Sequence, residues 1–329
     1  MSIIIDEVTL ENFKSYGDAT TIESLEDAFG AERALVYGIG GGGDVVGTIP
    51  TARLLEDHGV ETILGGIPWE RGVIDPTPGP YALDEIEHVD RVSETVGLAS
   101  GETRTHDGVR FAETHVAAHY DEPVALVDVT GGPGQVAAGL EAACDALGVD
   151  LVVGVDAGGD ALARGDEPGI RSPLADAIGV AALAELSVPT ALGVYGWGSD
   201  GELDPDELDA SLAAVAAEGA LLGAWGLTPR TVAELDGVLD AVETEASRLP
   251  VEAARGGLGE RTIRDGSRTL RLSAASTTTI YLDPAPVAAA SALVARVADV
   301  NSLEAAHRAL RDAGYVTELA IERGEVETR

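Results

Sequence analysis

Cysteine and lysine are scarce in this chain of 329 residues. Cys144 is the only cysteine, which excludes an internal disulfide and a cysteine-based zinc site and leads us to expect a cytoplasmic protein. Lys14 is the only lysine and lies far from any glycine-rich loop, which excludes a standard P-loop and a loop-based lysine Schiff base. The G-x-S-x-G nucleophile elbow is also missing, so hydrolase chemistry of that type is not expected.

Positive charge is equally limited. The chain has 21 Lys and Arg against 57 Asp and Glu, for a formal net charge of -36. Such self-repulsion needs concentrated counterions to screen it, so we expect a halophilic protein. Scattered cations cannot supply the basic face that nucleic acids require, and no apolar run reaches membrane length. We therefore expect neither a nucleic acid nor a membrane as partner.

Short apolar runs alternate with helical patterns from about residue 33 to residue 225. This alternation predicts an α/β fold, namely a Rossmann-like, doubly wound and mostly parallel sheet with helices on both faces. Capping patterns predict that helices begin after Ser172 and after Asp204. The expected strands are Ala34–Ile39, Thr62–Gly66, Val124–Thr130, Leu151–Asp156 and Pro189–Tyr195.

The C-terminal part does not follow this alternation of apolar runs and helical patterns. Glycines and alternating side chains between residues 254 and 283 predict a β-hairpin or edge strands. A helix pair, 285–298 and 302–313, should follow. We expect a single α/β domain over residues 1–329, in which 250–329 is either an integral part or a separate subregion.

The first glycine-rich loop follows a predicted strand and precedes a helical pattern. Glycine lets the backbone approach a ligand closely, and amides near a helix N-terminus attract anions. The spacing of Gly38, Gly40 and Gly43 also satisfies G-x-G-x-x-G, although the second strand ends in glycines and not in the acid that binds a ribose. A tight turn without a ligand is the alternative. The candidate ligand-binding residues of this loop are Gly40, Gly41, Gly42, Gly43 and Asp44.

Two further loops join a strand to a helical segment. Ligands bind beyond the carboxyl ends of parallel strands, so we expect all three loops to share one crevice. Each loop alone is also consistent with an ordinary glycine-rich connection between a strand and a helix that binds no ligand. The candidates from the second loop are Asp128, Thr130, Gly131, Gly132 and Gly134, and those from the third are Asp156, Gly158, Gly159 and Asp160.

Aspartates in a crevice that also attracts phosphates usually need a bridging divalent cation, and we expect magnesium. Asp156 and Asp160 are the candidates for a metal ligand or a general base. Arg171 is the candidate anion clamp, with Ser172 beside it, although a salt bridge at the start of a helix explains Arg171 equally well. His115 and His119 have the spacing of a helical metal site but lack the HExxH form, so a semi-buried helix face is the simpler interpretation.

Three segments together resemble a known family. They are GIGGGGDVVGTIPTARLLEDHG, VDAGGDALARGDEPGIRSPLADA and SRTLRLSAASTTTIYLD. The chain is similar to an archaeal and bacterial family catalogued as domain of unknown function 1152. The resemblance covers most of the chain and implies one large domain with a shared site at these positions. It implies no reaction.

The leading hypothesis is an enzyme that binds a small phosphorylated or nucleotide-type ligand in the three-loop crevice, assisted by magnesium. An NAD(P)-dependent oxidoreductase is the first alternative. A non-catalytic ligand-binding or assembly subunit is the second, in which the helices after Ala285 form the contact surface of a homo-oligomer.

Overall fold

The computed structural model describes residues 22–70, 72 and 74–326. Nine strands form one mixed sheet in the order β3-β4-β5-β2-β1-β6-β7-β11-β8, while β9 and β10 pair as a separate two-stranded sheet. The bounds are β1 (Arg33–Gly38), β2 (Glu61–Gly66), β3 (Ile86–Arg91), β4 (Val96–Thr105), β5 (Val124–Val127), β6 (Leu151–Ala157), β7 (Thr190–Tyr195), β8 (Leu221–Gly226), β9 (Gly259–Ile263), β10 (Arg268–Leu272) and β11 (Thr278–Leu282).

The centre of the large sheet is parallel and its two edges are antiparallel. Strands β5, β2, β1, β6 and β7 run in one direction. At one edge β4 runs against β5 and β3 against β4, and at the other edge β11 runs antiparallel between β7 and β8. The five central strands are the predicted ones, and the Rossmann-like, mostly parallel sheet is confirmed. The β3–β4 hairpin and β8 were not anticipated.

Helices surround the sheet, as the sequence predicts. Several begin with proline in the first helical turn, where the missing amide hydrogen costs no hydrogen bond. The bounds are α1 (Leu25–Ala28), α2 (Asp44–Asp57), α3 (Ala112–Tyr120), α4 (Pro133–Leu147), α5 (Pro173–Glu185), α6 (Pro205–Ala217), α7 (Pro229–Leu239), α8 (Glu245–Ala254), α9 (Pro284–Ala290), α10 (Ala292–Val297), α11 (Leu303–Asp312) and α12 (Glu318–Glu322).

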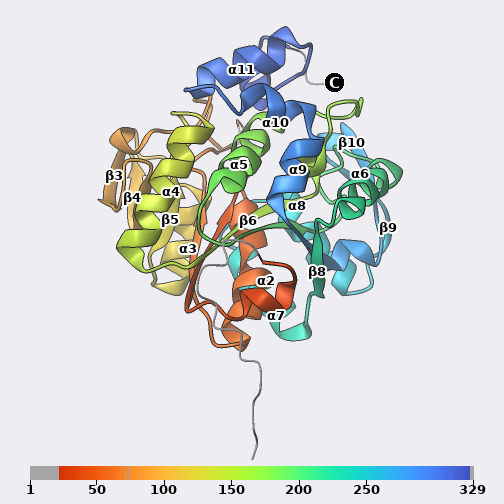
Figure 1. Ribbon diagram of the computed structural model, residues 1–329, viewed down its shortest axis with the longest axis horizontal. Helices are drawn as coiled ribbons and strands as arrows, with labels where there is room; N and C mark the ends of the chain where they lie inside the picture. Colours follow the sequence, from red (N-terminus) through yellow and green to blue (C-terminus); the bar gives the residue numbers. More distant parts are fainter. Residues whose placement is uncertain (1–21, 71, 73, 327–329) are drawn as a thin grey trace, which may run out of the picture.

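The core lies in two layers because side chains alternate along each strand. Leu35 and Tyr37 of β1 belong to the cluster that packs with α4, α5 and α9 to α11, whereas Ala34 and Val36 belong to the cluster that packs with α2, α3, α7 and α8. Both faces of the central strands are therefore buried, which explains their continuous apolar composition. Helices α10 and α11 lie together at the top of the molecule in Figure 1.

The order of the strands in the sheet determines where a ligand site is expected. From β1 the chain moves through β2 to β5 on one side, and then crosses to β6 and β7 on the other side of β1. The carboxyl ends of β1 and β6 are therefore the topological switch point, where open α/β sheets bind their ligands. The first and third glycine-rich loops follow these two strands.

The predicted hairpin is confirmed as the antiparallel pair β9 and β10, and α9 to α11 cover the predicted helix pair. The following strand, β11, returns to the main sheet between β7 and β8. Within the described part of the chain, no helix has both the length and the apolar character that crossing a membrane requires.

Candidate functional site

The first glycine-rich loop folds back on its own aspartate. The amide of Gly40 donates to Asp44 Oδ2 at 3.0 Å, and the amide of Gly42 donates to the carbonyl oxygen of Trp69 at 2.7 Å. Gly41 and Gly42 have positive φ angles of 80° and 57°, which favour glycine. A Cβ at Gly40 would lie only 2.6 Å from Asp44 Oδ2 and 3.3 Å from Asp176 Oδ1. The loop therefore brings its backbone against carboxylates, and two of its amides have partners within the protein.

Three aspartates meet at the switch point, and we call them the Asp156 group: Asp44, Asp156 and Asp176. They come from the start of α2, the end of β6 and the first turn of α5, and each offers an oxygen within 4.8 Å of the others. Asp156 and Asp176 are 1% and 3% exposed. The Oδ1 atoms of both have no hydrogen-bond partner, whereas Asp156 Oδ2 accepts from the amide of Ala161 at 3.2 Å.

Burial makes these carboxylates difficult to ionise. Desolvation raises the pKa of Asp44 to about 7, although hydrogen bonds from the amides of Gly40 and Ala157 oppose the shift. Desolvation, followed by the charge of Asp44, raises the pKa of Asp156 to about 7. The pKa of Asp176 is raised well above its ordinary value by desolvation and then by Asp156 and Asp44. Mutual repulsion of buried acids with unpartnered oxygens is relieved by a bound proton or a bound cation.

A second cluster lies beside the first, and we call it the Asp200 group: Asp160, Asp200 and Glu202. Its ligand atoms also lie within 4.8 Å of one another. Desolvation, followed by the charge of Glu202, raises the pKa of Asp200 to about 8. The pKa of Asp160 is raised well above its ordinary value by desolvation and then by Asp176, Asp156 and Asp200, so the two groups interact.

Glu202 differs from the other acids because its carboxylate is fully engaged. Its Oε2 accepts from the amides of Arg171 at 2.6 Å and Ser172 at 3.0 Å. Its Oε1 accepts from the Ser172 hydroxyl and, at 2.7 Å, from the Arg268 guanidinium. Ser172 precedes α5 at the predicted cap position, but its hydroxyl binds Glu202 and makes no capping hydrogen bond. Arg268 comes from β10, so the hairpin supplies positive charge to the Asp200 group.

The N-terminus of α5 is occupied by a carboxylate from the C-terminal part of the chain. Glu318, at the start of α12, accepts from the amides of Leu174 at 3.0 Å and Ala175 at 2.7 Å. Desolvation raises the pKa of Glu318 to about 7 despite these hydrogen bonds. The protein thus fills with its own acid a helix N-terminus that could attract a ligand anion.

The second glycine-rich loop lies apart from both acid groups. It follows β5, which is separated from β1 by β2. Asp128 accepts from the amides of Leu83 at 3.0 Å and Thr130 at 2.9 Å and from the Thr130 hydroxyl at 2.6 Å, so it stabilises the loop itself. A Cβ at Gly132 would meet the backbone that joins α10 to α11.

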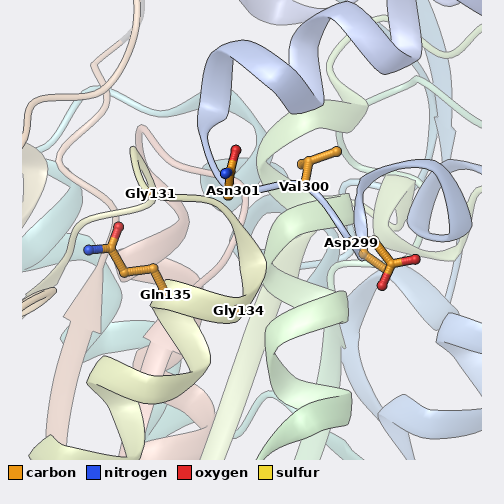
Figure 2. Close-up of a pocket in the computed structure, with 7 residues that line it drawn as sticks. Gly131, Gly134, Gln135, Asp299, Val300 and Asn301 are labelled. Carbon is orange, nitrogen blue, oxygen red and sulfur yellow. The ribbon is translucent and has the colours of Figure 1, made fainter.

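An open pocket of about 420 Å³ lies between this second loop and the α10–α11 connection. Figure 2 shows Gly131, Gly134 and Gln135 on one side and residues 299–301 on the other. Gln135 donates to Glu94 at 2.7 Å. The structure therefore brings together the candidates of the first and third loops, while those of the second loop face the C-terminal helices.

The two histidines of α3 take no part in the acid groups. His115 is half-buried, and His119 is exposed and packs edge-on against Tyr120 with ring centroids 4.9 Å apart. Within the described residues, the groups of three or more side chains suited to a metal contain only Asp and Glu. The helix-face interpretation of this pair is consistent with that arrangement.

Sequence reasoning overlooked several residues of the site. Asp200 follows the predicted strand that ends at Tyr195, so the rule that ligands bind beyond strand ends could have found it. Glu202 and Glu318 carried no local signal, because their partners lie at least 30 residues away in the chain. Glu113 is 1% exposed with both oxygens unpartnered, and its carboxyl group lies against Gly66 at the end of β2.

Comparisons with known proteins identify the family of this chain but indicate no activity. No curated protein and no solved structure matches this chain. The family described as protein of unknown function (DUF1152) matches residues 35–326, which include both acid groups, the hairpin and α12. The chain therefore belongs to the DUF1152 family, as its three motif segments suggested.

Proposed function

We propose that this protein is an enzyme that binds a divalent cation, with magnesium as the expected ion, and acts on a small phosphorylated or nucleotide-type ligand at the switch point. The observation that carries the proposal is the Asp156 group. Two of its three aspartates are almost completely buried, and each of these keeps an oxygen without a hydrogen-bond partner. Three carboxylates that are buried together and repel one another need a positive charge to be ionised at the same time.

The donor set fits a hard cation. Magnesium and related ions prefer carboxylate oxygens, keep part of their water shell and bind phosphate oxygens in the remaining positions. Gly40 leaves room beside Asp44 and Asp176 that a Cβ would fill. When bound, the cation would neutralise phosphate charge and polarise a ligand oxygen.

The protein's own residues would orient the ligand. Arg268 is held beside the Asp200 group by its hydrogen bond to Glu202. The charge of Arg264, at the other end of the same hairpin turn, lowers the pKa of Asp44. The hairpin would thus place the guanidinium groups of Arg264 and Arg268 beside the metal, where a phosphate would lie.

A nicotinamide dinucleotide is the second candidate ligand. Gly38, Gly40 and Gly43 precede α2 at the switch point, as in dinucleotide-binding folds. The strand β2 lacks the acid expected for a ribose, but the carboxyl group of Glu113 lies against Gly66 at that strand end. The partners of the Gly40 and Gly42 amides argue against a pyrophosphate in this loop.

Thermal unfolding in molar potassium chloride tests these candidates. The protein is heated with nucleotides, dinucleotides or sugar phosphates, each with and without magnesium, because a ligand that binds the folded state raises Tm. We expect stabilisation by magnesium, and further stabilisation by a phosphorylated compound only when magnesium is present. The Asp176→Asn variant should lose both effects, and Asp209→Asn, at an exposed position, should keep them. Stabilisation by a dinucleotide without magnesium would favour the second candidate, and no shift with any compound would refute both.

A further inference from the structure

We propose that the crevice binds two divalent cations of unequal affinity, the second one between Asp160 and Asp200 with Asp156 shared between the two sites. This inference rests on the proposed function, because it adds a second ion to the first. It assigns a role to the Asp200 group that a one-ion site leaves unexplained.

The two groups form one continuous cluster. Each contributes three oxygen ligands within 4.8 Å of one another. Asp156 Oδ2 accepts from the amide of Ala161, the residue that follows Asp160, at 3.2 Å, so the two groups adjoin at this turn. Asp156 Oδ1 has no hydrogen-bond partner and is left for a shared ion. Asp156 is therefore the natural bridge between the two sites.

An unpartnered oxygen points to a ligand in the second site. Asp200 is 6% exposed, and its Oδ1 has no hydrogen-bond partner, while its Oδ2 accepts from the amide of Glu202 at 3.3 Å. Asp200 lies directly over Gly158, whose φ is +137°, and a Cβ at that position would overlap the carboxyl group. The backbone at Gly158 thus leaves space for this buried carboxylate beside Asp160, although burying it without a partner is unfavourable.

Charge balance also favours two ions. The two groups contain six carboxylates; Arg268 pairs with Glu202, and the charge of Arg264 acts on Asp44. Two arginines with one divalent cation offset four of the six negative charges (2 + 2), and a second divalent cation raises this to six (2 + 4). Sites with two adjacent cations hold phosphate groups between them, which agrees with the proposed ligand class.

The Asp200 group should bind its ion more weakly. All the hydrogen-bond donors around Glu202 hold its oxygens away from a metal, so Asp160 and Asp200 supply the free oxygens. The positive charge of Arg268 also repels a cation there. In the Asp156 group, Asp156 and Asp176 each keep an oxygen without a hydrogen-bond partner, so this group should fill first.

Manganese binding to the full-length protein in molar potassium chloride tests the inference. Equilibrium dialysis counts the bound ions, and electron paramagnetic resonance detects magnetic coupling between two adjacent Mn²⁺ ions. We expect two specific ions with at least a tenfold difference in Kd and a coupled signal at saturation. Asp200→Asn should keep the tight ion and lose the weak ion together with the coupling, while the exposed control Asp209→Asn should keep both.

The outcomes separate the two proposals. One tight ion in the wild type, unaffected by Asp200→Asn and lost in Asp176→Asn, would overturn the second site and leave the proposed function standing. No specific ion would overturn both. If circular dichroism shows that Asp200→Asn does not fold, Asp160→Asn replaces it, and the wild-type stoichiometry and coupling decide the question without any variant.

Discussion

The Asp156 group and the Asp200 group have the same chemistry but different surroundings. Both consist of three acids at the carboxyl ends of parallel strands. In the Asp200 group, Glu202 receives two backbone amides, a hydroxyl and the Arg268 guanidinium. In the Asp156 group, Asp44 and Asp156 receive backbone amides. Two acids of this group, Asp156 and Asp176, keep an unpartnered oxygen, compared with Asp200 in the other group.

This difference shows how a protein can stabilise buried acids in two ways. Where an arginine is built into the fold, the carboxylate can be ionised without a ligand, and its contribution is structural. Where buried acids keep oxygens without a hydrogen-bond partner, they hold protons or take up an external cation, so their ionisation becomes coupled to ligand binding. The contrast, and not the number of acids, identifies the Asp156 group as the main candidate for function.

The largest expected effect is on the pH dependence of stability without a divalent cation. The folded pKa values of Asp44 and Asp156 are about 7, above the ordinary value of 3.8. The folded state therefore holds protons that the unfolded chain has lost, and stability falls as pH rises from about 4 to about 7, by at most about 1.4 kcal/mol per pH unit for each group. Chemical denaturation across this range, in wild type and in the Asp44→Asn/Asp156→Asn double variant, measures the difference.

Adding magnesium extends this test, because the proposed bound cation would keep the same carboxylates ionised in the folded state. At saturating magnesium the difference in pH dependence between wild type and the double variant should shrink. If the stability of wild type and of the double variant changes with pH in the same way without a divalent cation, repulsion among the acids of the Asp156 group does not destabilise the protein.

The next effect concerns Arg268. Replacing it in Arg268→Gln leaves Glu202, whose side chain is 1% exposed, without its ion-pair partner. Breaking a buried pair by removal of one partner costs about 3 kcal/mol, measured as the loss in free energy of unfolding. If Arg268 serves as a built-in cation, magnesium should restore part of this loss. Arg271→Gln, on an exposed residue of the same strand, is the matched control and should change stability little.

Asp176→Asn should act in opposite directions with and without the ion. Removing one of three buried acids relieves repulsion, so the cation-free variant should gain about 1 kcal/mol of stability. The same change removes a ligand oxygen, so the increase in Tm produced by magnesium should disappear. A variant that is destabilised without magnesium and still stabilised by it would contradict the role of Asp176. Thermal unfolding at fixed pH measures both quantities.

The smallest effects compare the first and second glycine-rich loops. In Gly40→Ala the new Cβ would meet the carboxylate ends of Asp44 and Asp176, which can shift, and we expect a loss of about 1 kcal/mol together with weaker magnesium binding. In Gly134→Ala the Cβ has open space in the first turn of α4, so stability should rise by about 0.5–1 kcal/mol because alanine favours a helix. Equal losses in both variants would mean that the second loop is as constrained as the first.

Local patterns predicted a large part of the fold. The five parallel strands were visible because both of their faces are buried, and the capping box at Asp204 is present, with the Glu207 amide donating to Asp204 at 2.9 Å. The β3–β4 hairpin was missed because its exposed and buried residues do not alternate regularly. The return of β11 to the main sheet was missed because its partners β7 and β8 lie far away in the sequence.

The candidate site was predicted less completely. Asp44, Asp156 and Asp160 stand directly at glycine-rich strand ends, so a local rule found them. Asp200 and Glu202 lie beyond a further strand end that was not searched for acids. The three predicted loops were expected in one crevice, but strand order separates the second loop from β1 by β2.

By itself, the sequence determined the fold class, the central strands, the family and the positions of acids near strand ends, since each depends on neighbouring residues and hydrophobic periodicity. Only the tertiary structure decided which acids meet. The switch point joins residues from β6, α2 and α5, and the hairpin brings Arg268 to Glu202 across 66 positions of sequence. Burial and charge pairing arise from such distant contacts, and they distinguish a buried acid with a partner from one that keeps an unpartnered oxygen.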